Sequence, residues 1–262
     1  VGMEFGLWTG RVKGEINVYT KKTANLLSNM DLPLSMGFSS YIANVGEVEN
    51  KGWEASFSGY AIRDSERRMN LMFSGQLVYN KNKITKLSDA IKAQNELYLQ
   101  EDVDVSNLFY EGRPQNAIYA VRSLGIDPAN GQELFITRNG VITHEWSGAD
   151  QVIVGNTEPK GQGSFGLNAS YKNFSLFASF MYEFGGQEYN STLVSKVENA
   201  DIQYSNVDKR VLTDRWQKPG DKVMFTRLIG GATANVTSVT KPTSRFVEDN
   251  NWLELSTLNV SY

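Results

Sequence analysis

The stretch MNLMFSGQLVYN, residues 69–80, decides the fold class, because apolar and polar side chains alternate along it with a period of two. In an extended strand, successive side chains point to opposite faces. One face therefore carries the odd-numbered residues from Met69 to Tyr79, which are apolar apart from Gly75. The other face is mostly polar, with Asn70, Ser74 and Gln76. The stretch predicts an amphipathic β-strand.

The same alternation recurs on both sides of this stretch, over residues 12–18, 53–61, 165–171 and 174–184. Each segment has one face of apolar, aromatic or glycine residues and a second face that is mostly polar, and the pattern is weakest over residues 12–18. Repeated period-two segments of this kind are typical of antiparallel sheets with two chemically different faces. The sequence therefore predicts an all-β protein.

The connections between these strands alternate in length. Short turns lie at Thr9–Arg11, Arg63–Arg68 and Lys172–Asn173, whereas long connections cover about residues 20–50, 81–161 and 185–250. Up-and-down barrels of the outer membrane have short periplasmic turns and longer extracellular loops. The order predicts an antiparallel transmembrane β-barrel segment of about seven spanning strands over residues 1–262, with the three long connections as extracellular loops.

A soluble β-sandwich is the alternative, since strands with one dry face also describe that fold. Loops longer than about 15 residues are uncommon in compact soluble domains, and two of the connections here are much longer. Part of the second connection has its own pattern: residues 133–136 and 141–145 flank Asn139-Gly140, which predicts a local hairpin.

Composition excludes several classes of function. The chain has 40% hydrophobic and 21% charged residues, a formal net charge of −3, and no cysteine. Disulfide scaffolds, thiolate metal sites and cysteine nucleophiles are therefore excluded, and the spread of lysine and arginine disfavours nucleic-acid binding. No stretch approaches the roughly 18 consecutive apolar residues of a transmembrane helix, a test that does not apply to strands that are apolar on one side only.

Aromatic residues occur near several predicted strand ends, at Tyr19, Tyr60, Tyr79, Tyr171, Tyr182 and Phe184. In a barrel, such residues form girdles at the level of the lipid headgroups. In a soluble sheet, they would be core residues or cross-strand pairs.

Several motifs resemble those of SusC/RagA-like TonB-dependent transporters. Residues 44–54, NVGEVENKGWE, resemble the family pattern N-x-G-x-x-x-N-K-G-x-E, and residues 80–84, NKNKI, resemble N-K-N-K-V. Residues 19–27, YTKKTANLL, resemble a strand exit that usually has an acid where Asn25 stands. Residues 111–114, EGRP, and 125–131, GIDPANG, resemble E-G-x-P and G-I-D-P-x-x-G.

The resemblance continues to the end of the chain. Gly155-Asn156 with Pro159-Lys160, then Arg215-Trp216 with Pro219-Gly220-Asp221, follow in family order. Residues 244–249, SRFVED, lead into LELSTLNVSY, residues 253–262, which resembles the strand L-R-L-x-x-x-x-L-x-Y. Glu254 replaces the usual basic residue of that strand, which leaves any role of the basic position open.

The resemblance implies a function for the parent protein. Family members have a barrel of about 22 strands around a plug, and nothing in this chain resembles a plug. It implies import of a bulky nutrient, an oligosaccharide or a peptide, across the outer membrane of a Gram-negative bacterium. The implied partners are a SusD-like surface lipoprotein and TonB, which pulls on the plug. Because the chain begins at Val1 and lacks a leader, we expect a portion of a longer protein.

Four aromatic residues of the predicted outer loops, Trp146, Tyr189, Tyr204 and Trp216, are the candidate ligand-binding residues, since their rings can stack on a sugar or peptide. Packing within the loops is the alternative. Residues 127–131 read as a turn rather than a calcium loop, and His144 as a loop residue without the partners of a metal ligand or general base. We expect no enzyme activity, metal or cofactor.

Two rival functions remain open at this point. A passive porin or an adhesin predicts a complete small barrel without a plug. A soluble carbohydrate-binding β-sandwich predicts a chain that folds in water without detergent, whereas a barrel segment exposes its apolar outer face and unpaired edge strands.

Overall fold

A long antiparallel sheet dominates the computed structural model, which describes residues 1–31, 40–100, 108–200, 202, 206–228 and 240–262. The sheet has the order β1-β2-β3-β4-β9-β10-β11 and is open, since β1 and β11 each pair with one neighbour only. Its strands are β1 (Gly2–Leu7), β2 (Val12–Asp31), β3 (Ser40–Asp64), β4 (Met69–Leu87), β9 (Gly161–Tyr171), β10 (Phe174–Tyr189) and β11 (Val247–Ser261).

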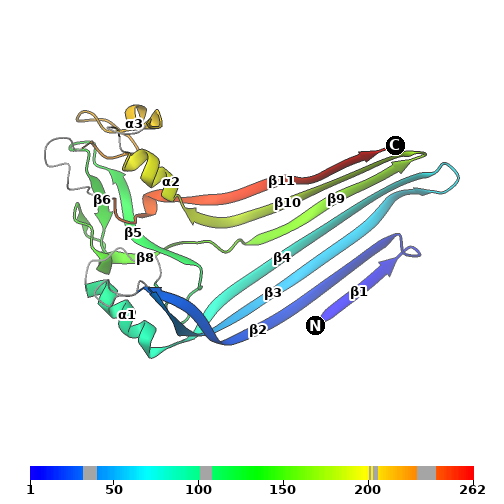
Figure 1. Ribbon diagram of the computed structural model, residues 1–262, viewed down its shortest axis with the longest axis horizontal. Helices are drawn as coiled ribbons and strands as arrows, with labels where there is room; N and C mark the ends of the chain where they lie inside the picture. The colour runs from blue at the N-terminus through cyan, green and yellow to red at the C-terminus, as the bar shows by residue number, and fades with distance from the viewer. Residues whose placement is uncertain (32–39, 101–107, 201, 203–205, 229–239) are drawn as a thin grey trace.

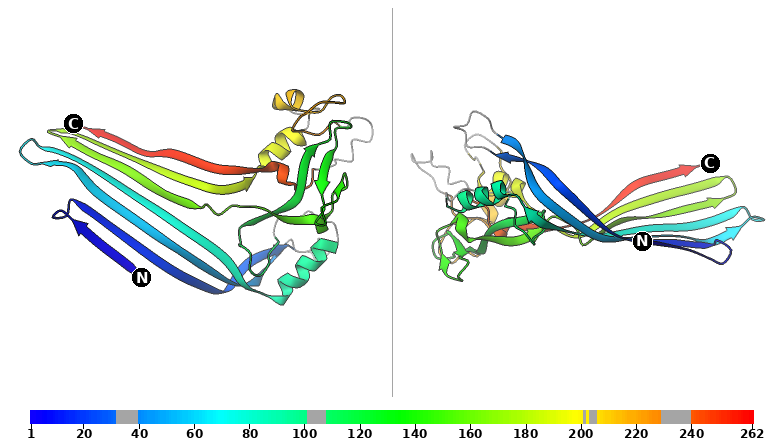
Figure 2. Two further views of the ribbon diagram at one scale, coloured as in Figure 1. Left: turned by 180° about the vertical axis from the view of Figure 1, so that it is seen from behind. Right: turned by 90° about the horizontal axis from the view of Figure 1, so that it is seen from below.

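The three short turns lie at one end of this sheet and the large insertions lie at the other, as Figure 1 shows. Figure 2 shows from two further directions that the long strands form a single twisted layer. A soluble sandwich requires a second sheet packed face to face on the first, and the smaller sheet instead lies beyond the end of the strands. The sandwich alternative is therefore wrong.

The register of the strands confirms the predicted faces. One row across the sheet consists of Phe5, Gly14, Phe57, Gly75, Phe165, Phe180 and Leu255, each aligned with the next on the neighbouring strand. We call the side that carries this row the apolar face. The adjacent row, on the polar face, contains Glu4, Glu15, Ser56, Gln76 and Ser164.

Large apolar side chains remain exposed on the apolar face. Phe57 is 57% exposed, Leu255 48% and Val260 68%. Glycines of this face lie beneath aromatic rings: a Cβ built on Gly75 would overlap the ring of Phe57, and one on Gly14 would overlap that of Phe5. Covering the glycine with a ring fills the space that a side chain would otherwise take. The face is thus smooth and apolar.

The strands β2 and β3 are longer than predicted. Residues 20–50 were expected to form a loop, but β2 continues to Asp31 and β3 begins at Ser40, and the two stay paired. The register shifts near Thr23 and Leu26, where Asn25 has a positive φ of 55°. Such a bulge breaks the period of two and hides the strand from pattern analysis.

The insertion between β4 and β9 contains one helix and a second sheet. Helix α1 (Asp89–Gln100) is followed by β5 (Ala117–Ile126), β6 (Glu133–Ile136), β7 (Ile142–Thr143) and β8 (Gln151–Asn156), which pair in the order β7-β6-β5-β8. The 3-10 turn η2 covers Gly148–Asp150. Pairing of β6 with β7 confirms the predicted hairpin across Asn139-Gly140.

The insertion between β10 and β11 contains short helical segments. These are α2 (Ser191–Leu193), the π-turn η3 (Val194–Glu198), α3 (Arg210–Thr213) and the 3-10 turn η4 (Ser244–Phe246). Val197, Val211 and Phe246 of these segments form a buried cluster with Phe225, which lies between α3 and η4. In the described part of the chain, no helix is long and apolar enough to cross a membrane.

Candidate functional site

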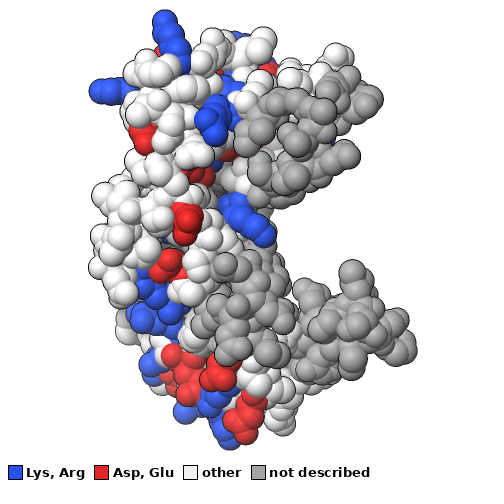
Figure 3. Space-filling model, turned by 90° about the vertical axis from the view of Figure 1, so that its left-hand side faces the viewer, with Lys and Arg blue, Asp and Glu red and all other residues white. Residues whose placement is uncertain are grey.

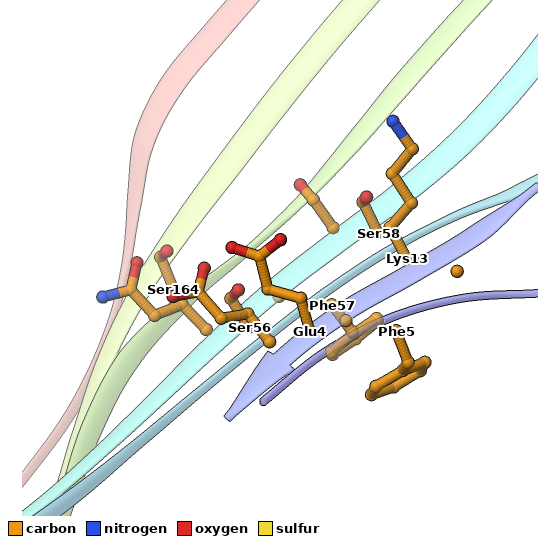
Figure 4. A pocket seen from close by; sticks show the side chains of 13 residues that line it. Glu4, Phe5, Lys13, Ser56, Phe57, Ser58 and Ser164 are labelled. Carbon is orange, nitrogen blue, oxygen red and sulfur yellow. The ribbon is translucent and has the colours of Figure 1, made fainter. Parts of the chain in front are cut away.

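The polar face carries an open groove of about 810 Å³ over β1 to β4 and β9. In Figure 4, Glu4, Lys13, Ser56, Ser58 and Ser164 lie on one side of the strands, and the rings of Phe5 and Phe57 lie on the other. The groove side therefore offers hydroxyl, carboxylate and ammonium groups. Such a surface can hydrogen-bond a polar solute or another polar protein surface.

A polar network joins the long sheet to the first insertion. Asn80 donates to Glu158 Oε1 (2.5 Å) and to Asn50 Oδ1 (3.0 Å), and it accepts from the Tyr19 hydroxyl (3.1 Å). The Asn82 backbone N–H donates to Glu158 Oε2 (3.1 Å). The motif residues of 50–54 and 80–84 thus lie side by side, and they hold the start of β9 through a glutamate that sequence analysis did not single out.

Two of the predicted girdle tyrosines lie elsewhere. Tyr19 is aligned with Gly52 and belongs to the network on the polar face, and Tyr60 is aligned with Met72 on that same face, beneath the guanidinium of Arg63. The girdle prediction is therefore wrong for these two residues. At the short-turn end, the apolar face instead carries Tyr171 together with the ring pair formed by Phe174 and Tyr262.

A buried ionic cluster joins the two insertions. Arg245 donates two hydrogen bonds to the Glu133 carboxylate (3.0 and 2.7 Å) and one to Glu198 Oε1 (2.8 Å). The three side chains are 6% exposed or less. Burial lowers the pKa of Arg245, but the hydrogen bonds to Glu133 and Glu198 outweigh it and raise the pKa above its usual range. The guanidinium is therefore always charged, and the cluster acts as a fixed clamp.

A second arginine supports the clamp from the side. Arg215 donates to the carbonyl oxygens of Val197 (2.5 Å), Glu198 (2.8 Å) and Thr226 (2.8 Å). Burial lowers its pKa, and the nearby charge of Glu198 opposes this effect. Arg215 thereby fixes the backbone around Glu198 and completes the link between η3 and the segment that follows α3.

The candidate aromatic residues do not form one site among the described residues. The Trp216 indole donates to the Pro128 carbonyl (2.9 Å), and that of Trp146 donates to the Pro242 carbonyl (3.1 Å). Tyr189 packs edge-on against Phe246, with 6.1 Å between ring centroids. Each of these three is half-buried in a different place, and Tyr204 lies outside the described residues. Their roles as ligand-binding residues stay predictions.

The 127–131 segment forms a turn that is held from within. Asp127 Oδ1 accepts from the Ala129 N–H (2.9 Å), and Asp127 Oδ2 lies 3.3 Å from His144 Nε2. The other ring nitrogen of His144 lies 3.1 Å from the Glu133 carbonyl. The Trp216 ring covers Gly131, where a Cβ would overlap it. The motif residues Arg215-Trp216 and 125–131 are therefore packed together.

The insertion end carries charges of both signs. Figure 3 looks onto this end and shows basic and acidic side chains of the described residues interspersed among uncharged surface. In the described residues, no group of three or more histidine, aspartate or glutamate side chains could hold a metal ion.

Comparison with curated proteins identifies similar chains. The sequence is 28% identical over 286 residues to TonB-dependent receptor P3 of Formosa agariphila, and this alignment covers all of the chain and 26% of the relative. It is 26% identical over 206 residues to the TonB-dependent receptor SusC of Bacteroides thetaiotaomicron, covering 74% of the chain and 20% of SusC. The chain spans about a quarter of the length of the curated relatives it matches. No protein-family model matches it.

Solved structures agree with the fold. The chain superposes on the RagAB peptide transporter with a TM-score of 0.76 at 23% identity, covering 99% of this chain and 28% of that one. The match to the open-open state of the RagAB peptide importer has a TM-score of 0.74. The resemblance to SusC/RagA-like TonB-dependent transporters and the antiparallel β-barrel fold are therefore confirmed, with the sheet open over the described residues.

Proposed function

We propose that this chain supplies wall strands and outer loops of a TonB-dependent transporter in the outer membrane of a Gram-negative bacterium. The observation that carries the proposal is the apolar face, which leaves large side chains exposed across all seven strands. A soluble protein rarely exposes a continuous apolar surface of this extent, whereas a barrel wall places it against lipid. The similarity to named TonB-dependent receptors supports the same function.

The short turns are assigned to the periplasmic rim and the insertions to the outside of the cell. The pattern of short and long connections supports this orientation. The aromatic residues Tyr171, Phe174 and Tyr262 then lie at the inner headgroup level, where amphipathic rings are favoured.

The cargo is a bulky nutrient, an oligosaccharide or a peptide, imported with a SusD-like surface lipoprotein and energised by TonB through a plug. The relatives support this reading, since one is SusC and one structural neighbour is the RagAB peptide transporter. The groove on the polar face, with Glu4, Lys13 and the serines, would then face the inside of the barrel. Relatives are receptors and transporters, which agrees with a protein that binds and moves solutes without chemical conversion.

The orientation is tested by labelling single cysteines in intact cells, because this chain has no cysteine of its own. Asn139→Cys lies in the turn between β6 and β7, and Asn173→Cys lies in the turn between β9 and β10. A membrane-impermeant maleimide should label the first variant in intact cells and the second only after the outer membrane is opened. Equal labelling of both in intact cells would contradict the orientation.

Energy coupling separates the transporter from a passive porin. Uptake of labelled oligosaccharide and peptide pools is compared in cells with and without TonB. An active transporter loses uptake without TonB, whereas a porin of the same fold keeps it.

A further inference from the structure

A second pocket lies in the first insertion, away from the groove on the polar face. It has a volume of about 530 Å³, and its described lining comes from four places in the chain. Tyr110, Glu111 and Arg113 follow α1, Tyr119 lies on β5, and Arg138 approaches from the turn between β6 and β7. Gln151, Val152 and Ile153 on β8 complete the lining.

Three residues that line this pocket carry an unpartnered polar atom. The hydroxyls of Tyr110 and Tyr119 and Oε1 of Gln151 are buried and have no hydrogen-bond partner among the described residues. The Gln151 residue is 1% exposed and Tyr119 is 6% exposed. A buried polar group without a partner costs about 1–3 kcal/mol, so native structures satisfy nearly all of them. Three such groups at one pocket indicate that something polar completes it.

The charges at the pocket favour an anion. Arg113 is exposed, and its guanidinium has no ion-pair partner in the described part of the chain. Arg138 donates to the Gln151 carbonyl (2.8 Å), which keeps this second guanidinium at the edge of the pocket. The one acidic group of the described lining, Glu111, is already paired with Lys92 (3.0 Å) and accepts from the Leu87 N–H (2.9 Å).

The tyrosines add a stacking and donor surface. Their rings lie 5.5 Å apart and are tilted by 49°. Burial and the neighbouring Tyr110 raise the pKa of Tyr119 to about 12, although the charge of Arg113 opposes this shift. The Tyr119 hydroxyl therefore stays protonated at physiological pH and can donate a hydrogen bond.

We propose that this pocket binds a carboxylate-bearing solute, with Arg113 pairing the carboxylate and with Tyr110, Tyr119 and Gln151 completing hydrogen bonds to the adjacent polar groups. The chemistry is shared by the chain end of a short peptide and by a sugar acid. The inference goes beyond the proposed transport function, because binding at this pocket is measured without transport.

The test is calorimetric titration of the full-length protein, purified in detergent, with two matched pairs of probes. One pair is N-acetyl-trialanine and its C-terminal amide; the other is digalacturonic acid and its neutral counterpart, galactobiose. A charge-assisted hydrogen bond contributes enough that the carboxylated member of at least one pair should bind about tenfold more tightly than its neutral twin. The pair that shows the difference identifies the source of the carboxylate.

Variants assign the effect to the pocket. Arg113→Ala should remove the preference for the carboxylated probe, and Arg113→Lys should keep part of it. Tyr119→Phe should weaken binding of both members of a pair, because it removes a hydroxyl and no charge. The matched control is Arg67→Ala in the exposed turn between β3 and β4, which should leave all affinities unchanged.

Three results would overturn the proposal: no binding by any probe, equal binding within both pairs, or an unchanged preference in a folded Arg113→Ala variant. Folding is checked by the heat-dependent gel mobility of the barrel. Failure of binding would leave TonB-dependent uptake untouched, so the two proposals are tested separately.

Discussion

The long sheet and the insertions differ in where they bury side chains. In the seven-stranded sheet, the buried apolar residues Val48, Ile84 and Leu87 lie at the insertion end. Farther along the strands, the described residues include one more buried apolar residue, Ala178. The insertions instead bury Phe225, Phe246 and a charged cluster. The comparison teaches that the sheet is stabilised mainly by its backbone ladder, whereas the insertions are stabilised by side chains packed away from water.

Breaking the clamp in the insertions should have the largest effect. Arg245→Ala leaves the buried carboxylates of Glu133 and Glu198 without their shared cation, which should destabilise the local structure by about 3–5 kcal/mol. Trypsin cleavage after Lys209 and Lys222 of the full-length protein in detergent should then accelerate by about a hundredfold or more, because proteolysis follows the open population.

The exposed pair between Arg210 and Asp208 is the control for this variant. Its atoms lie 2.8 Å apart, but both side chains are largely solvated. Asp208→Ala should leave the cleavage rate nearly unchanged, since exposed ion pairs contribute little and this substitution removes no basic residue at which trypsin cleaves. Similar acceleration by both substitutions would mean that burial does not distinguish the clamp.

A charge on the apolar face should have the next largest effect. Phe57→Lys places an ammonium on the side assigned to lipid, and a lysine at the middle of a bilayer costs a barrel about 2–4 kcal/mol. Ser58→Lys, one residue away on the polar face, should cost much less. Urea unfolding in lipid vesicles measures both, and equal losses would refute the assignment of the two faces.

Crowding a glycine of the ladder should have a smaller effect. A Cβ on Gly163 would overlap the carbonyl oxygen of Gln76, which belongs to the backbone of β4 and has no freedom to rotate away. Gly163→Ala should therefore destabilise the sheet by about 1–3 kcal/mol. Gly59→Ala, where the nearest atom would be 3.5 Å away, should be neutral or slightly stabilising. The same urea titration separates the two variants, and equal midpoints would argue against close backbone approach at Gly163.

The smallest effect is expected at Trp216. Trp216→Phe keeps a ring over Gly131 but removes the hydrogen bond to Pro128, which should cost about 1 kcal/mol. Trp53→Phe in the sheet, whose indole has no hydrogen-bond partner in the described chain, should change stability less. Protease resistance of each region is the readout, and a larger loss at Trp53 would reverse the comparison.

The long sheet was predictable from sequence because one of its faces is apolar and the other is polar. Alternation assigned Phe57, Phe73 and Leu167 to one face, and the short turns set the ends of the strands. The extension of β2 to Asp31 was missed, since a ladder of backbone hydrogen bonds leaves no side-chain pattern once a bulge shifts the register. Helix α1 was missed because, among its residues whose burial is described, Ile91 is the one fully buried apolar residue.

The clamp was not predictable by pattern. Arg245 is separated by 112 residues from Glu133 and by 47 from Glu198, so no local spacing records that they meet. The motif around residues 244–249 marked Arg245 without revealing its partners. The candidate aromatic residues were chosen only because their rings can stack on a ligand. In the structure, the indole N–H groups of Trp146 and Trp216 donate to backbone carbonyls of the protein itself.

The position of the insertions has a consequence for how such genes diverge. Residues 69–78 of β4 pair with residues 162–171 of β9, although residues 88–160 intervene between the two strands. Codons gained or lost within that interval leave this register intact, because each added residue lengthens a loop whose ends are already fixed side by side. The insertion can therefore change in length and sequence while the paired strands on either side of it are inherited unchanged.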